Sequence, residues 1–245
     1  MKKFIRNSSY LLNTYDGQLH FKIVGEGEAV LLLHGNRQSH LVFAKLSHLL
    51  KRQYCLIQLD TPGHGASVLG VRRLTMEQIV DDVAFLLKRL EVKKIKIIGF
   101  SDGANIALEF AAKYSEKTKA VIAISPNLHP EGLKWWWRII IEGHHALLSM
   151  LIHFKLPFQH QKQLTELMLY QSQLVQKLHI NVTSPILILS GTHDLIKIEH
   201  LQEIATMFPH AIVKVLKNTH HLSLFRETAR YSKIIEGFLA YSNKQ

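Results

Sequence analysis

Short, continuously apolar segments alternate along this chain with longer segments in which apolar residues recur every three or four positions. The short segments are typical of strands that are buried on both faces of a parallel sheet. The pattern predicts such strands at Ala29 to Leu33, Tyr54 to Leu59, Ile95 to Ile98, Ala120 to Ile124, Pro185 to Leu189 and Ile212 to Leu216.

The longer segments predict helices between these strands. Thr75 is placed to cap a helix that runs to Leu90, because a threonine hydroxyl can accept a hydrogen bond from the first helical turn. Further helices are expected at Ala104 to Tyr114, Ile198 to Phe208 and Thr228 to Leu239. Strands that alternate with helices indicate an α/β protein with helices on both faces of a mostly parallel sheet.

The alternation lapses between Asn127 and Asn181, where the sequence is aromatic, rich in His and Gln, and helical in pattern. We interpret 127–181 as a helical cap inserted over the strand ends. Residues 1–126 and 182–245 then form one core domain, and 245 residues suit a single sizeable core.

The amino-acid composition limits which binding partners and which cellular compartment we expect. The formal charge of +11 could favour anionic partners, but the lysines are dispersed and no nucleic-acid-binding motif accompanies them, so no nucleic-acid partner is expected. The single cysteine, Cys55, and an N-terminus without a signal-peptide core predict a cytoplasmic protein. The apolar stretch from Trp135 to Leu156 contains too many charged and His residues for a membrane span.

The segment Gly99-Phe100-Ser101-Asp102-Gly103 follows one predicted strand and precedes a predicted helix. This is the context of a nucleophile elbow, in which a strained turn presents a serine hydroxyl at the edge of the sheet. A side chain at Gly99 or Gly103 would clash in so tight a turn. The sequence therefore predicts Ser101 as a nucleophile, with a chance glycine-bearing loop as the alternative.

A serine nucleophile needs a histidine base that is oriented by a carboxylate, in the chain order Ser, acid, His. Asp194 follows the strand ending at Leu189 through the turn Ser190-Gly191-Thr192-His193, and it is the predicted acid. A helix cap is the alternative role for Asp194. The base is His221 or His220; the lengths of the flanking elements favour His221, and Leu222 two places after His220 favours His220.

Four motifs together resemble the short-chain α/β-hydrolase family over nearly the whole chain. They are Asp16-Gly17-Gln18-Leu19-His20 with Gly25-Glu26-Gly27, Leu32-Leu33-His34-Gly35-Asn36, Asp60-Thr61-Pro62-Gly63-His64-Gly65-Ala66-Ser67, and the elbow around Ser101. The resemblance implies an α/β-hydrolase fold and an oxyanion hole formed by the backbone N–H groups of Asn36 and Asp102. It also implies that Asp60 and His64 are structural, and that 127–181 is the cap that shapes the substrate pocket.

The expected function is hydrolysis of a small, partly apolar carboxylic ester through an acyl-enzyme, without an organic cofactor or a metal. A thioesterase, an aminopeptidase, a carbon–carbon hydrolase and a lyase could use the same triad. A hydrolase-like receptor that binds a small ligand is the alternative from another class. The cluster Trp135, Trp136 and Trp137 could line an acyl pocket, contact lipid or pack the cap onto the core. The sequence predicts no oligomeric state.

Overall fold

The computed structural model describes residues 7–169 and 182–243. In these residues an 8-stranded sheet has the order β1-β2-β4-β3-β5-β6-β7-β8. Its strands are β1 (Ser8–Asn13), β2 (Gln18–Val24), β3 (Glu28–Leu33), β4 (Tyr54–Leu59), β5 (Ile95–Phe100), β6 (Thr118–Ile124), β7 (Ile186–His193) and β8 (Ala211–His220). The strands β1 and β2 pair antiparallel, and β3 to β8 run parallel to one another.

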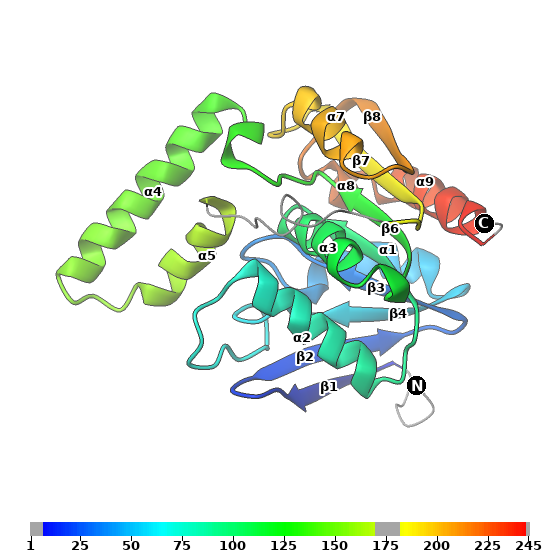
Figure 1. Ribbon diagram of the computed structural model, residues 1–245, viewed down its shortest axis with the longest axis horizontal. Helices are drawn as coiled ribbons and strands as arrows, with labels where there is room; N and C mark the ends of the chain where they lie inside the picture. Colours follow the sequence, from blue (N-terminus) through cyan, green and yellow to red (C-terminus); the bar gives the residue numbers. More distant parts are fainter. Residues whose placement is uncertain (1–6, 170–181, 244–245) are drawn as a thin grey trace.

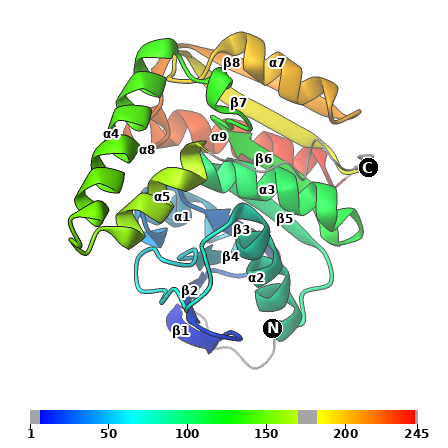
Figure 2. The same cartoon turned by 60° about the vertical axis from the view of Figure 1, so that its left-hand side comes forward.

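Helices cover both faces of the sheet (Figures 1 and 2). The α-helices are α1 (Ala44–Leu50), α2 (Met76–Arg89), α3 (Asp102–Lys113), α4 (Trp135–His153), α5 (Gln159–Leu169), α7 (Ile198–Thr206), α8 (Ser223–Arg226) and α9 (Thr228–Tyr241). Short 3-10 helices occur at η1 (His40–Phe43), η2 (Ser115–Lys117) and η3 (Pro130–Gly132). The predicted α/β-hydrolase architecture is confirmed.

Two apolar cores lie on opposite faces of the sheet, because successive side chains of a strand point to opposite sides. Within β3, Leu31 and Leu33 pack with the apolar sides of α2, α3 and α7. Val30 and Leu32 pack with those of α1, α8 and α9. Every residue of β4 and β5 is buried, which explains why their sequences are apolar apart from Gln58 and Lys96.

Several predicted boundaries were wrong at the edge of the sheet where the parallel strands end. β5 continues to Phe100 and α3 already begins at Asp102, so only Ser101 separates them. β7 continues through the predicted turn to His193, and β8 continues past Leu216 to His220. The last residues of both strands are polar and partly exposed, so the sequence shows no apolar pattern there. The two strand ends nevertheless pair with each other.

The insertion 127–181 is helical where the structure describes it, and 170–181 lie outside the described residues. Its long helix α4 extends away from the sheet, and α5 returns towards it (Figure 1). No helix in the described parts of the chain has the length and apolar content needed to cross a bilayer.

Candidate active site

Ser101 occupies a sharp turn between β5 and α3. Its φ of 54° and ψ of −121° are unfavourable for a residue with a side chain. The turn is held by hydrogen bonds from the N–H of Ser101 to the carbonyl of Ile124 (2.8 Å) and from the N–H of Ala104 to the carbonyl of Ser101 (2.8 Å). These constraints keep the strained serine at the end of a buried strand.

The two glycines of the elbow allow close contacts of the main chain. A Cβ atom at Gly99 would collide with the carbonyl of Gly103, and one at Gly103 would collide with the carbonyl of Leu33. Neither neighbour is a flexible side chain that could move aside. The predicted clash at both positions is confirmed.

His221 lies between Ser101 and Asp194. Its Nδ1 is 2.7 Å from Asp194 Oδ1, and its Nε2 is 3.3 Å from Ser101 Oγ. The imidazole also packs against the ring of Phe100, with centroids 4.9 Å apart. This arrangement lets one ring nitrogen face the hydroxyl while the carboxylate fixes the other.

His220 lies at the end of β8 and points elsewhere. Its ring stacks on that of His193, with centroids 5.1 Å apart, and its backbone N–H donates to Ser223 Oγ over 2.9 Å. The strand end is irregular at Asn218, whose φ is 58°, a left-handed value that asparagine tolerates. Because β8 continues to His220, the prediction that a loop begins directly after Leu216 was wrong.

Asp194 is buried and accepts several hydrogen bonds. Ser125 and Ser190 donate their hydroxyls to Oδ2 over 2.5 and 2.9 Å, and the N–H of Leu195 donates to Oδ1 over 2.6 Å. Burial by itself raises the pKa of Asp194, but the contact with His221 and the two hydroxyls lower it to about 2. The carboxylate is therefore ionised at neutral pH.

Asp194 is not a helix cap, because the N-cap of α7 is Lys197. The sequence reasoning did not identify Ser125 and Ser190 as partners of this carboxylate. Ser125 could have been suspected from its place directly after β6, where parallel strands bring their ends together. Nothing in the sequence pointed to Ser190 as a partner of Asp194, because the predicted turn included it, whereas it lies in β7.

The residues of the predicted oxyanion hole are joined through their side chains. Asn36 donates its Nδ2 to Asp102 Oδ2 over 2.7 Å, and also to the carbonyl of Leu164 in α5 over 2.7 Å. Within the described residues, no group accepts a hydrogen bond from the backbone N–H of Asn36 or Asp102. Both N–H groups thus remain able to donate to another oxygen.

Burial dominates the electrostatics of Asp102. It raises the pKa of this carboxyl to about 6, although the hydrogen bond from Asn36 and the nearby His221 act in the opposite direction. The side chain is only 6% exposed. Asp102 is thus a buried acid directly beside the strained serine.

The helices of the insertion border this site. α5 contacts the loop after β3 at two points. The carbonyl of Leu164 in α5 accepts from Asn36 of the loop, and Arg37 of the loop donates to Thr165 Oγ1 in α5 over 2.9 Å. The chain just before α4 contacts the loop after Asp194, where the N–H of Lys134 donates to the carbonyl of Leu195 over 2.9 Å.

The tryptophan cluster begins α4. Trp135 and Trp136 are exposed, and the rings of Trp136 and Trp137 lie 5.0 Å apart. Exposure of the first two contradicts the alternative in which the whole cluster packs the cap onto the core. Trp137 is partly buried.

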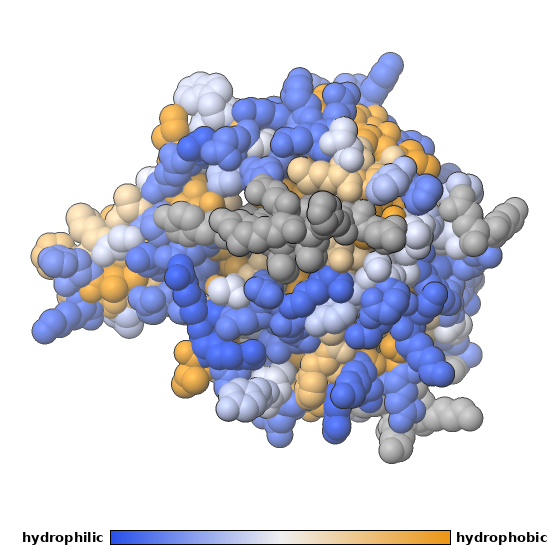
Figure 3. Space-filling model, in the orientation of Figure 1, coloured by the Kyte–Doolittle hydropathy of each residue, from blue (hydrophilic) through white to orange (hydrophobic). Residues whose placement is uncertain are grey.

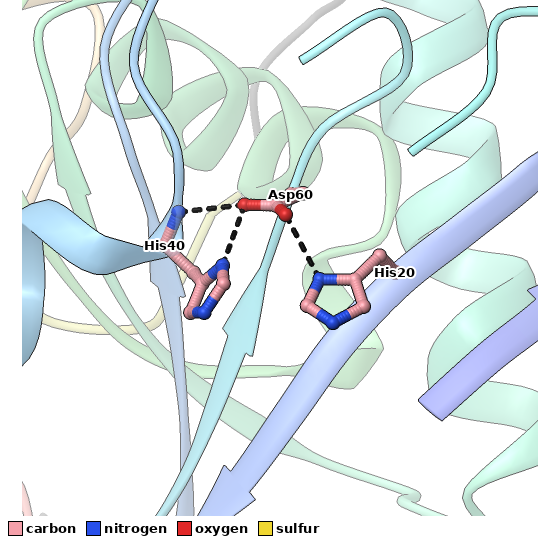
Figure 4. A group of neighbouring side chains, drawn as sticks. All are labelled: His20, His40 and Asp60. Atoms are coloured by element: carbon pink, nitrogen blue, oxygen red, sulfur yellow. Dashed lines mark hydrogen bonds and ion pairs between the residues drawn. The ribbon is translucent and has the colours of Figure 1, made fainter. Parts of the chain in front are cut away.

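A second polar cluster surrounds Asp60 (Figure 4). Asp60 Oδ1 lies 2.6 Å from the backbone N of His40 and 2.9 Å from its Nδ1, while Oδ2 lies 2.9 Å from His20 Nδ1 and 3.0 Å from the N of Ala66. Burial raises the pKa of Asp60, but the hydrogen bonds from Ala66 and His40 outweigh it and the net pKa is lowered.

The sequence did not reveal this cluster, because its members are far apart in the chain. His20, His40 and Asp60 offer three atoms of metal-ligand type within 4.8 Å of one another. The four N–H donors, however, already occupy the acceptor positions of the carboxylate. The arrangement is that of a closed hydrogen-bond network that anchors the glycine-containing loop after β4.

Comparison with known proteins agrees with the fold. A family model for the alpha/beta hydrolase fold matches residues 28–160, more than half of the chain. The putative 2-succinyl-6-hydroxy-2,4-cyclohexadiene-1-carboxylate synthase of Bacillus subtilis is 33% identical over 128 residues, covering 49% of this chain and 46% of that protein. The pimeloyl-(acyl-carrier protein) methyl ester esterase of Chromobacterium violaceum is 33% identical over 111 residues, covering 44% and 42%.

The chain thus spans less than half the length of these curated relatives. Over the whole fold, an alpha/beta hydrolase enzyme from a Medee basin deep-sea metagenome library matches with a TM-score of 0.81 at 18% identity, covering 94% of this chain and 97% of that one. The chain belongs to the alpha/beta hydrolase fold family.

Proposed function

We propose that this protein is a serine hydrolase that cleaves a small, partly apolar carboxylic ester through an acyl-enzyme. The observation that carries the proposal is the line of contacts from Asp194 through His221 to Ser101, with distances of 2.7 and 3.3 Å. In this line a weak nucleophile is hydrogen-bonded to a base, and the base is oriented by a carboxylate.

In the first step, Ser101 Oγ attacks the ester carbonyl and His221 Nε2 takes the hydroxyl proton. The tetrahedral oxyanion receives hydrogen bonds from the N–H groups of Asn36 and Asp102; removing one such donor typically costs about 3 kcal/mol in the barrier. His221 then protonates the leaving alkoxide, which departs as an alcohol and leaves an ester on Ser101.

In the second step, His221 removes a proton from water while the resulting hydroxide attacks the acyl carbonyl. His221 returns the proton to Ser101 Oγ as the carboxylic acid leaves. Asp194 stays ionised throughout, in keeping with its low pKa, and stabilises the imidazolium that forms in each step.

We assign the cap to 127–181. α5 contacts the oxyanion loop and the start of α4 contacts the acid loop, so both helices border the region that a substrate would occupy. Leu164 of α5, whose carbonyl contacts Asn36, is apolar and buried, which favours a partly apolar acyl or alcohol group.

Carbon–carbon or lyase chemistry on the same residues is the second candidate, because one relative is named as a synthase and not as an ester hydrolase. The relative named as a methyl ester esterase favours ester hydrolysis. The two differ in whether a covalent acyl group forms on Ser101.

The test combines labelling with turnover. A fluorophosphonate probe should modify Ser101 and not Ser101→Ala, since a serine paired with a base reacts much faster than a surface hydroxyl. Purified protein should also hydrolyse p-nitrophenyl esters, with a dependence on chain length. Quenching during turnover should trap an acyl group on Ser101 by mass spectrometry.

Absence of labelling at Ser101 in folded protein would refute the nucleophile. Labelling without turnover of any ester would instead favour the carbon–carbon chemistry or the small-ligand receptor.

A further inference from the structure

α4 carries an apolar stripe on the side that faces away from α5. The stripe consists of Trp136, Ile140, Gly143, Leu147, Met150 and Phe154. Their side chains are exposed to 41% at Trp136, 52% at Ile140, 48% at Leu147, 51% at Met150 and 68% at Phe154. Figure 3 shows hydrophobic residues at the outer margin of the region formed by α4 and α5.

The opposite side of α4 already has a partner. His144 Nδ1 lies 3.2 Å from Thr165 Oγ1, His145 Nε2 lies 3.5 Å from Glu166 Oε1, and Leu148 is buried. Although adjacent in sequence, the two histidines therefore both face α5. The stripe does not take part in this contact.

The spacing of the stripe is that of a coiled-coil seam. Its members follow one another at intervals of four, three, four, three and four residues, which is a heptad repeat. A heptad seam keeps facing a second helix along its whole length, whereas a face that only covers a core is usually wider. No member of the seam is charged, so a like helix can approach without electrostatic repulsion.

An antiparallel copy of α4 fits this seam. When the two helices run in opposite directions, Trp136 lies opposite Phe154 of the second copy and Ile140 lies opposite Met150. Gly143 then lies opposite Leu147, and a Cβ at Gly143 would meet no atom within 4 Å, so there is room for the leucine. A twofold axis makes both copies use the same residues, as in most homodimers.

We propose that α4 forms a homodimer interface in which the stripe pairs with the stripe of a second copy. The buried area supports a stable dimer: half-exposed aromatic and aliphatic side chains each contribute about 100 Å². With Trp135 and Ile139 beside the stripe, each copy buries about 700 Å², close to the roughly 800 Å² per partner of a standard interface.

A lipid surface is the rival occupant, and the local charges favour the second copy. Arg138, the one Lys or Arg residue within α4 itself, is engaged by Glu142 (2.6 Å) and Glu131 (3.2 Å). A helix that binds anionic lipid typically carries surplus Lys and Arg on its polar face. The interface is independent of the proposed hydrolysis, because Ser101, His221 and Asp194 lie outside it.

Sedimentation-velocity ultracentrifugation of the whole chain tests the proposal. The wild type should sediment as a dimer at micromolar concentration, and Leu147→Glu should sediment as a monomer with an unchanged circular dichroism spectrum. Val71→Glu is the control, because Val71 is 97% exposed elsewhere on the surface and should leave the dimer intact. A monomeric wild type, or a dimer that survives Leu147→Glu, would overturn the proposal.

Crosslinking tests the antiparallel register. The native cysteine, Cys55, is buried, so the unmodified chain should not react with a short bis-maleimide. Ala146 is exposed beside the stripe and close to the proposed twofold axis. Ala146→Cys should therefore crosslink into a dimer, and Leu11→Cys, on the exposed side of β1, should not.

Equal crosslinking of the two variants would contradict the register. Flotation with phosphatidylglycerol vesicles that is lost in Leu147→Glu, together with a monomeric wild type, would assign the stripe to lipid instead.

Discussion

The side chain of Asn36 donates a 2.7 Å hydrogen bond to the carboxylate of Asp102, the residue that directly follows Ser101. The contact joins the ends of β3 and β5 at the two residues proposed to form the oxyanion hole. It also places a buried acid, with its pKa raised to about 6, next to the nucleophile. The stability of the protein should therefore report on this site.

Asp102→Asn should change how stability depends on pH. Because the folded protein binds the Asp102 proton more tightly than the unfolded chain does, wild-type stability falls as pH rises from about 4 to 6. The amide removes that dependence, so the variant should be more stable than wild type above pH 6, on the order of 1–3 kcal/mol. The difference should vanish below about pH 4.

Urea unfolding across this pH range measures the effect. Glu199→Gln, at an exposed position, is the control and should follow the wild type. Parallel curves for Asp102→Asn and wild type would show that burial does not perturb this carboxyl.

Asp194→Asn should keep the fold and lower kcat for ester hydrolysis by about 10⁴-fold, because the imidazole loses the partner that fixes its tautomer. Ser190→Ala removes one of several donors to the same carboxylate and should lower kcat far less. Initial rates of p-nitrophenyl acetate hydrolysis measure the effect of each substitution, and circular dichroism verifies that each variant is folded. Turnover near wild type in Asp194→Asn would remove Asp194 from the catalytic residues.

The two neighbouring histidines should behave very differently. His221→Ala should abolish fluorophosphonate labelling and ester turnover, since the proton of Ser101 then has no acceptor. His220→Ala loses a stacking contact with His193 but keeps its backbone hydrogen bond to Ser223, so turnover should persist at a cost of about 1 kcal/mol or less in stability. The reverse result would make His220 the base, and activity in both variants would refute the triad.

Asp60→Asn should destabilise the fold by about 2–4 kcal/mol, because an amide turns one acceptor into a donor in front of buried N–H groups. The lowered pKa of Asp60 gives the sign of the pH effect: its contribution is present at neutral pH and is lost as pH falls below about 4. Asp81→Asn, at a more exposed carboxylate, is the matched control. Chemical unfolding gives both values.

A separate experiment tests the expectation that no metal is bound. Treatment with EDTA should leave the wild-type melting temperature unchanged if His20, His40 and Asp60 form only a hydrogen-bond network. A marked decrease would indicate an ion in this cluster instead.

The sequence by itself determined the fold and the position of the proposed nucleophile. Strands buried on both faces are continuously apolar, and the helix over Met76–Arg89 with its Thr75 cap has both a clear period and a capping residue. Glycines on either side of Ser101 mark a turn in which backbone atoms approach too closely for side chains. Each of these signals is local, because it depends on the chemistry of neighbouring residues.

Only the tertiary structure showed which histidine lies between Ser101 and Asp194 and revealed the partners of Asp194. β8 is an edge strand with partly exposed, polar residues near its end, so hydropathy could not show that it continues to His220. That extension turns His220 towards His193 and leaves His221 to face Ser101. Ser125 and Ser190 reach Asp194 because parallel strands end at one edge of the sheet, a proximity that depends on strand order and not on any local sequence signal.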